Sequence, residues 1–137
     1  MFASVFVGHL EYATGTMRFA SAGHNPPLLY RAATQSFELL KAKGILVGVL
    51  EDVNFDEKTV QLEPDDVIVM YTDGVTEAMT LDNEEYGMER LKDAICAQAG
   101  ASASELGRHI LRDLAVFSGE RGAFDDETMV IIKRNAT

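Results

Sequence analysis

Through the first half of the chain, apolar and polar residues alternate with a period of two, which is typical of strands that bury one face. In the segment 16–22, Met17 and Phe19 fall on one face and Arg18 on the other. A turn near Gly15 separates this segment from the one before it, so the two are expected to form a hairpin. Read in this way, the first half contains predicted strands at 4–10, 16–22, 28–32, 36–40, 44–50 and 55–62, and those at 28–32 and 36–40 are expected to form a second hairpin.

Two later segments, 67–72 and 129–133, are apolar with little interruption. The pattern predicts two more strands there, and the first of them reads as the most deeply buried strand of the chain. Between these segments the period changes, because Met88, Leu91 and Ile95 recur at helical spacing. A helix is therefore expected to begin just after residue 87.

A capping box predicts the start of a second helix. The side chain of Ser102 is placed to accept from the backbone amide three residues on, and Glu105 to reach back to the backbone of residue 102. The apolar residues that follow also recur at helical spacing: Leu106, Ile110, Leu111, Leu114 and Phe117. Many strands, two helices and a final strand together indicate an α+β fold, with helices layered on antiparallel sheet.

Composition narrows the class of protein without identifying it. The chain has 137 residues, of which 47% are hydrophobic, and this suits one domain with a real core. The net charge of −10 and the lack of a basic stripe argue against a nucleic-acid partner. No apolar run approaches the ~20 residues of a membrane span. A single cysteine, Cys96, and a start without a basic segment lead us to expect a cytoplasmic protein.

Two carboxylate clusters flank the two most apolar segments. Asp73 follows the strand at 67–72, while Asp125 and Asp126 precede the strand at 129–133. If these strands are antiparallel neighbours, Asp73 and Asp125 meet at one edge of a sheet. Two carboxylates held close together favour a shared cation, and Mg²⁺ or Mn²⁺ suits oxygen ligands of this kind. The alternative is a pair of ordinary polar turns, with Gly74 completing the first of them.

The stretch "AGHNPP" leaves a similar choice open. His24 is a candidate metal ligand or proton donor, or it merely caps a tight turn made by Gly23. Glu77, four residues after Asp73, is either a further ligand that points toward that aspartate or a solvated carboxylate. The spacing alone favours the turn for His24 and the solvated side chain for Glu77.

Taken together, the motifs resemble a known family. The stretches "RFASAGHNPPLLYR", "ILVGV", "VIVMYTDGVTEAMT", "EEYGMERL" and "FDDETMVII" occur in one order. They are similar to the C-terminal half of the SpoIIE-like branch of the PPM metal-dependent serine/threonine phosphatases, which includes RsbU-like regulators of sigma factors. The resemblance implies a partial αββα sandwich, in which antiparallel sheets lie face to face and two helices pack on the outside.

The resemblance also implies roles for particular residues. In this family the aspartate of the "DG" motif and the first aspartate of "DD-x-T" are ligands of a binuclear Mn²⁺ or Mg²⁺ centre, and these positions match Asp73 and Asp125. Asp126 would lie next to these ligands without binding a metal ion itself. A third, weaker metal position would fall to Glu77 and His24, although the wider superfamily has an acidic residue where this chain has the histidine.

Two acidic motifs of the family's N-terminal half are absent from the sequence. Residues 1–137 are thus expected to form the C-terminal portion of a phosphatase domain, which holds one side of a site for two Mn²⁺ or Mg²⁺ ions and lacks the other. The implied reaction is the hydrolysis of phosphoserine or phosphothreonine on a regulatory protein, such as an anti-anti-sigma factor. The chain alone is expected to be weakly active or inactive.

Two other interpretations remain open. The chain is alternatively a degenerate, non-catalytic module that binds a regulatory partner, or an unrelated α+β domain, which the motif set disfavours. If a missing half normally pairs with the strand at 4–10, that strand is an unpaired sheet edge in the isolated chain. We therefore expect the isolated chain to form a dimer or a larger species.

Overall fold

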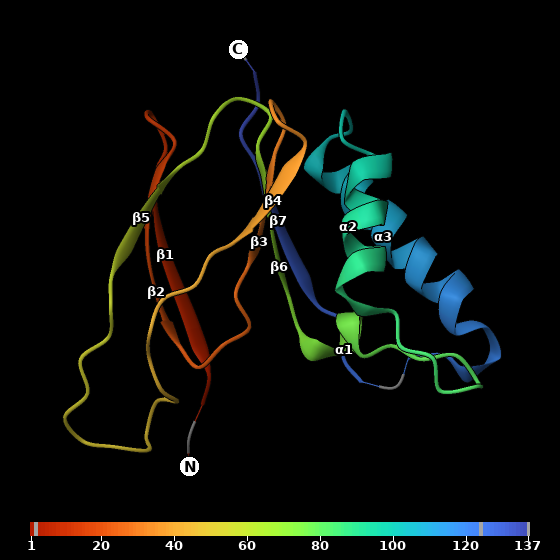
Figure 1. Ribbon diagram of the computed structural model, residues 1–137, viewed down its shortest axis with the longest axis horizontal. Coiled ribbons are helices and arrows are strands. Elements are labelled where there is room, and N and C mark those ends of the chain that lie inside the picture. The colour runs from red at the N-terminus through yellow and green to blue at the C-terminus, as the bar shows by residue number, and fades with distance from the viewer. Residues whose placement is uncertain (2, 124, 137) are drawn as a thin grey trace.

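The computed structural model describes residues 1, 3–123 and 125–136, and it places the alternating segments of the sequence in two antiparallel sheets that lie face to face (Figure 1). Helices cover the outer face of one sheet only, within the described residues. The strands are β1 (Val5–Glu11), β2 (Thr16–Ala22), β3 (Leu28–Arg31), β4 (Ser36–Leu39), β5 (Lys58–Gln61), β6 (Val67–Tyr71) and β7 (Met129–Lys133). The helices are α1 (Asp73–Thr76), α2 (Gly87–Ala97), α3 (Ala103–Ser118) and the short 3-10 helix η1 (Gly119–Arg121).

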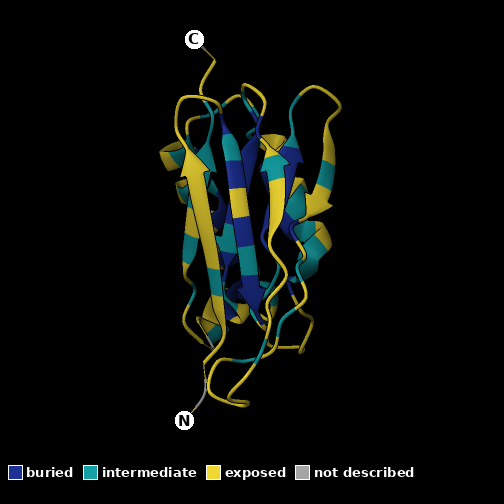
Figure 2. Ribbon diagram, turned by 90° about the vertical axis from the view of Figure 1, so that its left-hand side faces the viewer, coloured by how far each residue is buried: buried dark blue, intermediate teal, exposed yellow. Residues whose placement is uncertain are grey.

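The order of the strands separates the chain into a three-stranded and a four-stranded sheet. The three-stranded sheet has the order β1-β2-β5, and the four-stranded sheet has the order β4-β3-β6-β7. Strand β6 pairs with β3 on one side and with β7 on the other, so it lies inside its sheet. Strand β1 lies at an edge of the three-stranded sheet, where exposed residues dominate (Figure 2).

Strand β6 separates two layers of core, which explains why its sequence is apolar throughout. Val69 and Tyr71 face the helices and pack in a cluster with residues of α2 and α3. Ile68 and Met70 face the other way and pack against the three-stranded sheet. Because side chains alternate along a strand, both faces of β6 need apolar residues.

A buried carboxylate fixes the turn that leads into β6. Asp66 is 1% exposed, and it accepts hydrogen bonds from the guanidinium of Arg31 at 2.9 Å and from the backbone amides of Ala32 and Glu63 at 3.0 and 2.9 Å. A buried charge is tolerated when it is paired and hydrogen-bonded in this way. The bonds attach the start of β6 to the end of β3.

The α+β fold class is confirmed, as are both predicted hairpins, the capping box and the two long helices. The predicted strand at 44–50 is wrong. This segment makes one bridge, between Val47 and Ala3, and a side-chain carbon added at Gly44 would lie 1.9 Å from the carbonyl oxygen of Ser21. The segment therefore crosses the end of β2 closely and forms no ladder of its own. The turn predicted at Asp73 is also different, because this residue begins the short helix α1.

Candidate metal centre

Thr72 joins the C-terminal end of β6 to the segment that leads into β7. The backbone amide of Thr72 donates to the carbonyl of Thr128 at 3.0 Å, which extends the ladder one step beyond β6. The hydroxyl of Thr72 donates to the carbonyl of Asp126 at 2.7 Å and accepts from the amide of Thr128 at 3.1 Å. The loop that carries Asp73 and the loop that carries Asp125 are thus held side by side.

This close approach explains why a glycine follows Asp73. A side-chain carbon built on Gly74 would lie 2.1 Å from the carbonyl oxygen of Asp126, far inside van der Waals contact. No other residue type fits at position 74 unless one of the two loops moves. A glycine is therefore needed after Asp73, at the end of the apolar strand β6, because the loop before β7 crosses directly against position 74.

The segment between β2 and β3 contributes the third part of the site. The side-chain amide of Asn25 donates to Oδ1 of Asp73 at 2.5 Å. Beside it, Nδ1 of His24 shares a hydrogen bond of 3.0 Å with the hydroxyl of Ser4. Gly23 has a φ of +69°, a left-handed conformation that turns the chain toward these contacts at little cost for glycine.

These three segments surround a pocket of about 320 Å³. Its lining residues are Ser4, Gly23, His24, Asn25, Thr72, Asp73, Asp125 and Asp126. Among the described residues that line it, three are carboxylates and none is a lysine or arginine. One carboxylate oxygen of Asp125 accepts from the amide of Asp126 at 2.7 Å, which orients the Asp125 side chain.

The chemistry of the donors suits a hard divalent cation, but the donors are few. Carboxylate oxygens are the protein ligands that Mg²⁺ prefers, and such sites commonly use one or two carboxylates and keep several waters. Within the part of the chain that the structure describes, no group of three His, Cys, Asp or Glu side chains is arranged to hold a metal ion. The residues present thus fit one side of a cation site.

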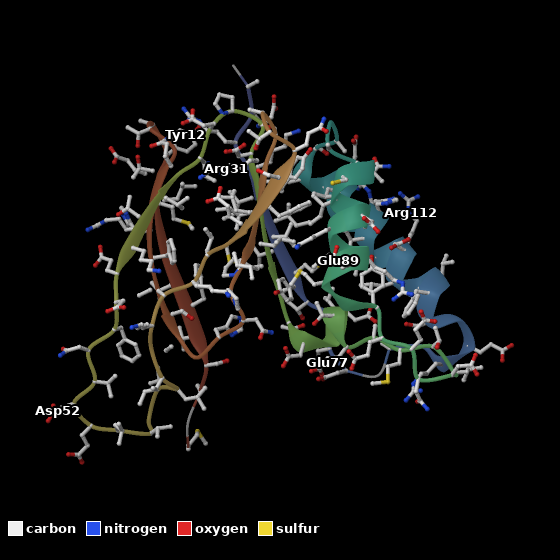
Figure 3. The ribbon with its side chains drawn as sticks, in the orientation of Figure 1. Tyr12, Arg31, Asp52, Glu77, Glu89 and Arg112 are labelled. Carbon is white, nitrogen blue, oxygen red and sulfur yellow. The ribbon has the colours of Figure 1, made fainter. Side chains whose placement is uncertain are left out.

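Glu77 lies apart from the other candidate residues. Its backbone amide caps α1 by donating to the carbonyl of Asp73 at 2.8 Å, and its side chain is exposed beside that helix (Figure 3). It does not line the pocket in which Asp73, Asp125, Asp126 and His24 meet.

The negative charge of Asp73 also reaches the end of β6. Burial raises the pKa of the Tyr71 hydroxyl, and the charge of Asp73 raises it further. The Tyr71 hydroxyl therefore ionises only at a higher pH than an exposed tyrosine does.

Sequence reasoning missed Asn25, Thr72 and Ser4 as parts of the site. Asn25 stands directly after His24 and before two prolines, and a polar residue held between such turn-forming residues was the available signal. Thr72 precedes Asp73 at the end of an apolar strand, where an uncharged hydroxyl is easily taken for a surface residue. Ser4 carried no local signal, because its contact with His24 spans 20 residues of sequence.

Comparison with known proteins identifies relatives across almost the whole chain. Residues 1–135 match the family model described as Stage II sporulation protein E (SpoIIE). The chain is 31% identical over 136 residues to the phosphoserine phosphatase RsbU of Bacillus subtilis, an alignment that covers 98% of this chain and 39% of RsbU. The chain spans only 21% to 39% of the length of the curated relatives it matches.

Solved structures share the fold. The RsbU and RsbW domains of Rv1364c from Mycobacterium tuberculosis superpose with a TM-score of 0.75 and 26% identity, which covers 98% of this chain and 37% of that one. The phosphatase domain of SpoIIE from Bacillus subtilis, in a manganese-presoaked form, gives a TM-score of 0.65 at 14% identity, covering 98% of this chain and 57% of that one.

Proposed function

Because this chain belongs to the SpoIIE family, within the PPM-type protein phosphatases, we propose that it supplies one side of a divalent metal centre that hydrolyses phosphoserine or phosphothreonine on a regulatory protein. One observation carries this proposal. Asp73 and Asp125, 52 positions apart in the sequence, line one pocket because Thr72 joins their two loops.

In this proposal each residue of the pocket has a distinct task. Asp73 and Asp125 hold Mn²⁺ or Mg²⁺, two ions in the complete centre, of which this chain provides part of the ligands. When bound, such cations lower the pKa of water and neutralise charge on phosphoryl oxygens. Asn25 occupies Oδ1 of Asp73, which leaves Oδ2 for a cation. Asp126 and His24 line the same pocket and add to its negative and polar character.

The charge of the pocket supports a role for cations in substrate binding. A phosphoryl group carries negative charge, and the described lining has three carboxylates and neither lysine nor arginine. Bound cations would have to reverse this local field before a phosphorylated side chain could enter. A phosphatase that worked without metal would need basic side chains in their place.

We infer the substrate class from the relatives. RsbU is named a phosphoserine phosphatase, and the Rv1364c chain carries an RsbU domain beside an RsbW domain. A phosphorylated regulator such as an anti-anti-sigma factor is therefore the proposed substrate, and the cytoplasm is the proposed location. No helix in the described part of the chain is long and apolar enough to cross a membrane.

A second candidate function is that of a non-catalytic module which binds a regulatory partner. One observation favours it: the described residues lack a group of three side chains that could hold a metal ion. Since this module would keep the fold without needing a cation, the two functions differ in whether Asp73 binds metal.

Titration of Mn²⁺ into the purified chain by calorimetry separates the two functions. We expect binding by the parent, loss of binding in Asp73→Asn, and unchanged binding in Asp82→Asn, which alters an exposed aspartate outside the pocket. Hydrolysis of a phosphoserine peptide by the same samples would then measure how much activity this side of the centre supports. If neither the parent nor Asp82→Asn binds Mn²⁺, the metal role of Asp73 in this chain is wrong and the binding module is favoured.

A further inference from the structure

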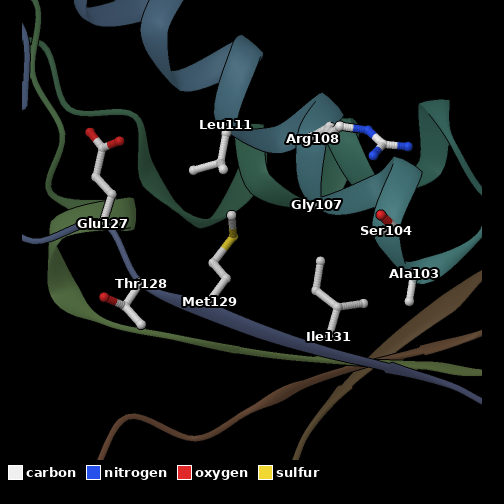
Figure 4. Close-up of a pocket in the computed structure, with 9 residues that line it drawn as sticks. All are labelled: Ala103, Ser104, Gly107, Arg108, Leu111, Glu127, Thr128, Met129 and Ile131. Carbon is white, nitrogen blue, oxygen red and sulfur yellow. The ribbon is translucent and has the colours of Figure 1, made fainter.

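Two packed elements fix the ends of the segment that carries Asp125. Residues 119–128 lead from α3 to β7. The helix packs directly on this strand, since a side-chain carbon on Gly107 would lie 3.5 Å from Ile131 (Figure 4). Because both of its ends are held in this way, the position of Asp125 depends on the contacts that the segment makes between α3 and β7.

Arg121, at the start of this segment, contacts the chain that follows Asp73. Its Nη1 atom donates to the carbonyl oxygen of Thr80 at 3.0 Å and to Oδ1 of Asn83 at 2.8 Å. Thr80 comes seven positions after Asp73. The guanidinium therefore bridges the two stretches of chain that carry the aspartates of the candidate site.

Together with Thr72, this bridge closes a ring around the two aspartates. Thr72 precedes Asp73 and bonds to Asp126, which follows Asp125. Arg121 precedes Asp125 and bonds beyond Asp73. Each aspartate thus lies between two links along its own stretch of chain. With only one link, the two stretches would be free to swing apart at the other end.

The acceptors of the bridge belong to a small hairpin. The amide of Asn83 donates to the carbonyl of Thr80 at 3.0 Å, and the amide of Thr80 donates to the carbonyl of Glu84 at 2.9 Å. Arg90 of α2 donates to the carbonyl oxygen of Glu85 at 2.7 Å. The hairpin is therefore attached to the helical layer, and Figure 1 shows it, in green, beside the C-terminal end of α3.

The backbone of Asn83 explains why this residue type receives the bridge. Its φ is +62°, a left-handed conformation that asparagine adopts more readily than most side chains do. Glycine adopts it too, but it has no side-chain oxygen to accept from Arg121. Asparagine thus meets both demands of the position, the turn of the hairpin and an acceptor for the guanidinium.

We propose that Arg121 is a positioning residue of the metal centre, which holds the stretches that carry Asp73 and Asp125 together before a cation binds. Two carboxylates repel each other when no cation lies between them, so the loops need a restraint in the metal-free chain. If the restraint is lost, the apparent affinity for the cation falls with the fraction of chains in which the two stretches remain together. This inference rests on the proposed function, because only cation binding gives the restraint this use.

Calorimetric titration of Mn²⁺ into two variants tests the role of the bridge. Arg121→Ala removes both bonds and should weaken binding about tenfold, and Asn83→Gly removes one bond and should weaken it about threefold. The direction is diagnostic, because loss of a positive charge alone would strengthen the binding of a cation. Glycine also keeps the left-handed backbone at position 83, so Asn83→Gly changes the bond and not the turn.

Each variant has a matched control. Arg112→Ala removes an exposed positive charge from α3, and Gln35→Gly places glycine at another exposed residue with a left-handed backbone, where φ is +52°. Neither residue lines the pocket of the candidate site, and both variants should bind Mn²⁺ no more weakly than the parent. Circular dichroism establishes that every variant is folded, and if Arg121→Ala does not fold, Asn83→Gly decides the test.

Hydrogen exchange in the metal-free chain, measured by NMR, gives a second readout that does not depend on activity. The amides of Asp126 and Thr128 are hydrogen-bonded in the parent and should exchange faster in Arg121→Ala and Asn83→Gly. Unchanged exchange in both variants overturns the proposal. Parent-like affinity in both overturns it as well but leaves the proposed function standing. A parent that binds no Mn²⁺ overturns the proposed function itself and, with it, the metal role of Arg121.

Discussion

The four-stranded sheet is covered on both faces, whereas the three-stranded sheet is covered on one in the described part of the chain. Ile68 of β6 is completely buried between the sheets, and Val69 beside it is completely buried under the helices. Val7 of β1, by contrast, is 61% exposed, and Arg18 of β2 forms an exposed ion pair with Glu57. The free energy of folding therefore depends more on the four-stranded sheet, both of whose faces are buried, than on the three-stranded sheet, which buries one.

The largest expected effect comes from truncating one apolar side chain in each sheet, Ile68 in the four-stranded sheet and Val7 in the three-stranded sheet. Ile68→Ala removes methylene and methyl groups from a fully buried position and leaves a cavity between the sheets, so it should lower the free energy of unfolding by about 4 kcal/mol. Val7→Ala should change it by less than about 0.5 kcal/mol, because this side chain is largely in water. Urea unfolding measures both values, and equal losses would contradict the contrast between the sheets.

A somewhat smaller effect is expected where the two loops of the site cross. Gly74→Ala forces the added carbon against the carbonyl oxygen of Asp126, so one loop must move, at a cost of about 3 kcal/mol. Gly100→Ala is the matched control, because nothing lies within 4 Å of a side-chain carbon at that position. Thermal unfolding should show a lowered midpoint for the first variant and a midpoint equal to the parent or higher for the second. A parent-like midpoint for Gly74→Ala would mean that the loops are free to separate.

A third effect concerns metal affinity. Asn25→Ala removes the amide that holds Oδ1 of Asp73, and the proposed site should then bind Mn²⁺ about tenfold more weakly. Because Asn25 is only half-buried and lies outside both cores, the free energy of unfolding should change little. Calorimetric titration beside Asn54→Ala, an exposed asparagine that does not line the pocket, measures the change. Unaltered affinity in Asn25→Ala would show that the amide does not position the carboxylate.

The sequence predicts the features of this chain that depend on local residue patterns, such as strands and helix caps. The antiparallel neighbours 67–72 and 129–133 follow from two apolar runs, and the capping box follows from Ser102 and Glu105 alone. The strand expected at 44–50 is absent because apolar residues there find no partner strand and Gly44 crosses β2. Pattern cannot predict such a crossing, because it depends on residues distant in sequence.

In the candidate site, too, the approach of the carboxylates follows from local pattern, whereas the hydrogen bonds that position them do not. The meeting of Asp73 with Asp125 in one pocket was predicted from strand order, and the structure brings them there with His24 and Asp126. The bonds that hold them come from Thr72 and Asn25, whose partners lie 54 and 48 positions away. Those partners become evident only when the strands are paired in register. The metal roles themselves remain predictions that the titration with Mn²⁺ tests.

The smallest expected effect is a dependence of stability on alkaline pH that belongs to the helical layer over the four-stranded sheet. Tyr86 is 1% exposed, and its hydroxyl donates to Oδ2 of Asp113 at 2.5 Å. Burial, followed by the bond to Asp113 and the charge of that carboxylate, raises the pKa of Tyr86 well above its ordinary value of 10.0. The folded protein therefore keeps this proton at pH values where the unfolded chain has lost it.

Because the pKa of Tyr86 is higher in the folded state, its contribution to stability is complete below about pH 10 and is lost as the pH rises from there toward the folded-state pKa. Urea unfolding at about pH 9 and about pH 11 should show a larger loss of free energy in the parent than in Tyr86→Phe, which has no hydroxyl to ionise. Tyr12→Phe, at a tyrosine that is 96% exposed, should lose as much as the parent. If the parent and Tyr86→Phe lose equal amounts, the hydroxyl of Tyr86 ionises as readily in the folded protein as in the unfolded chain, and the bond to Asp113 does not hold its proton.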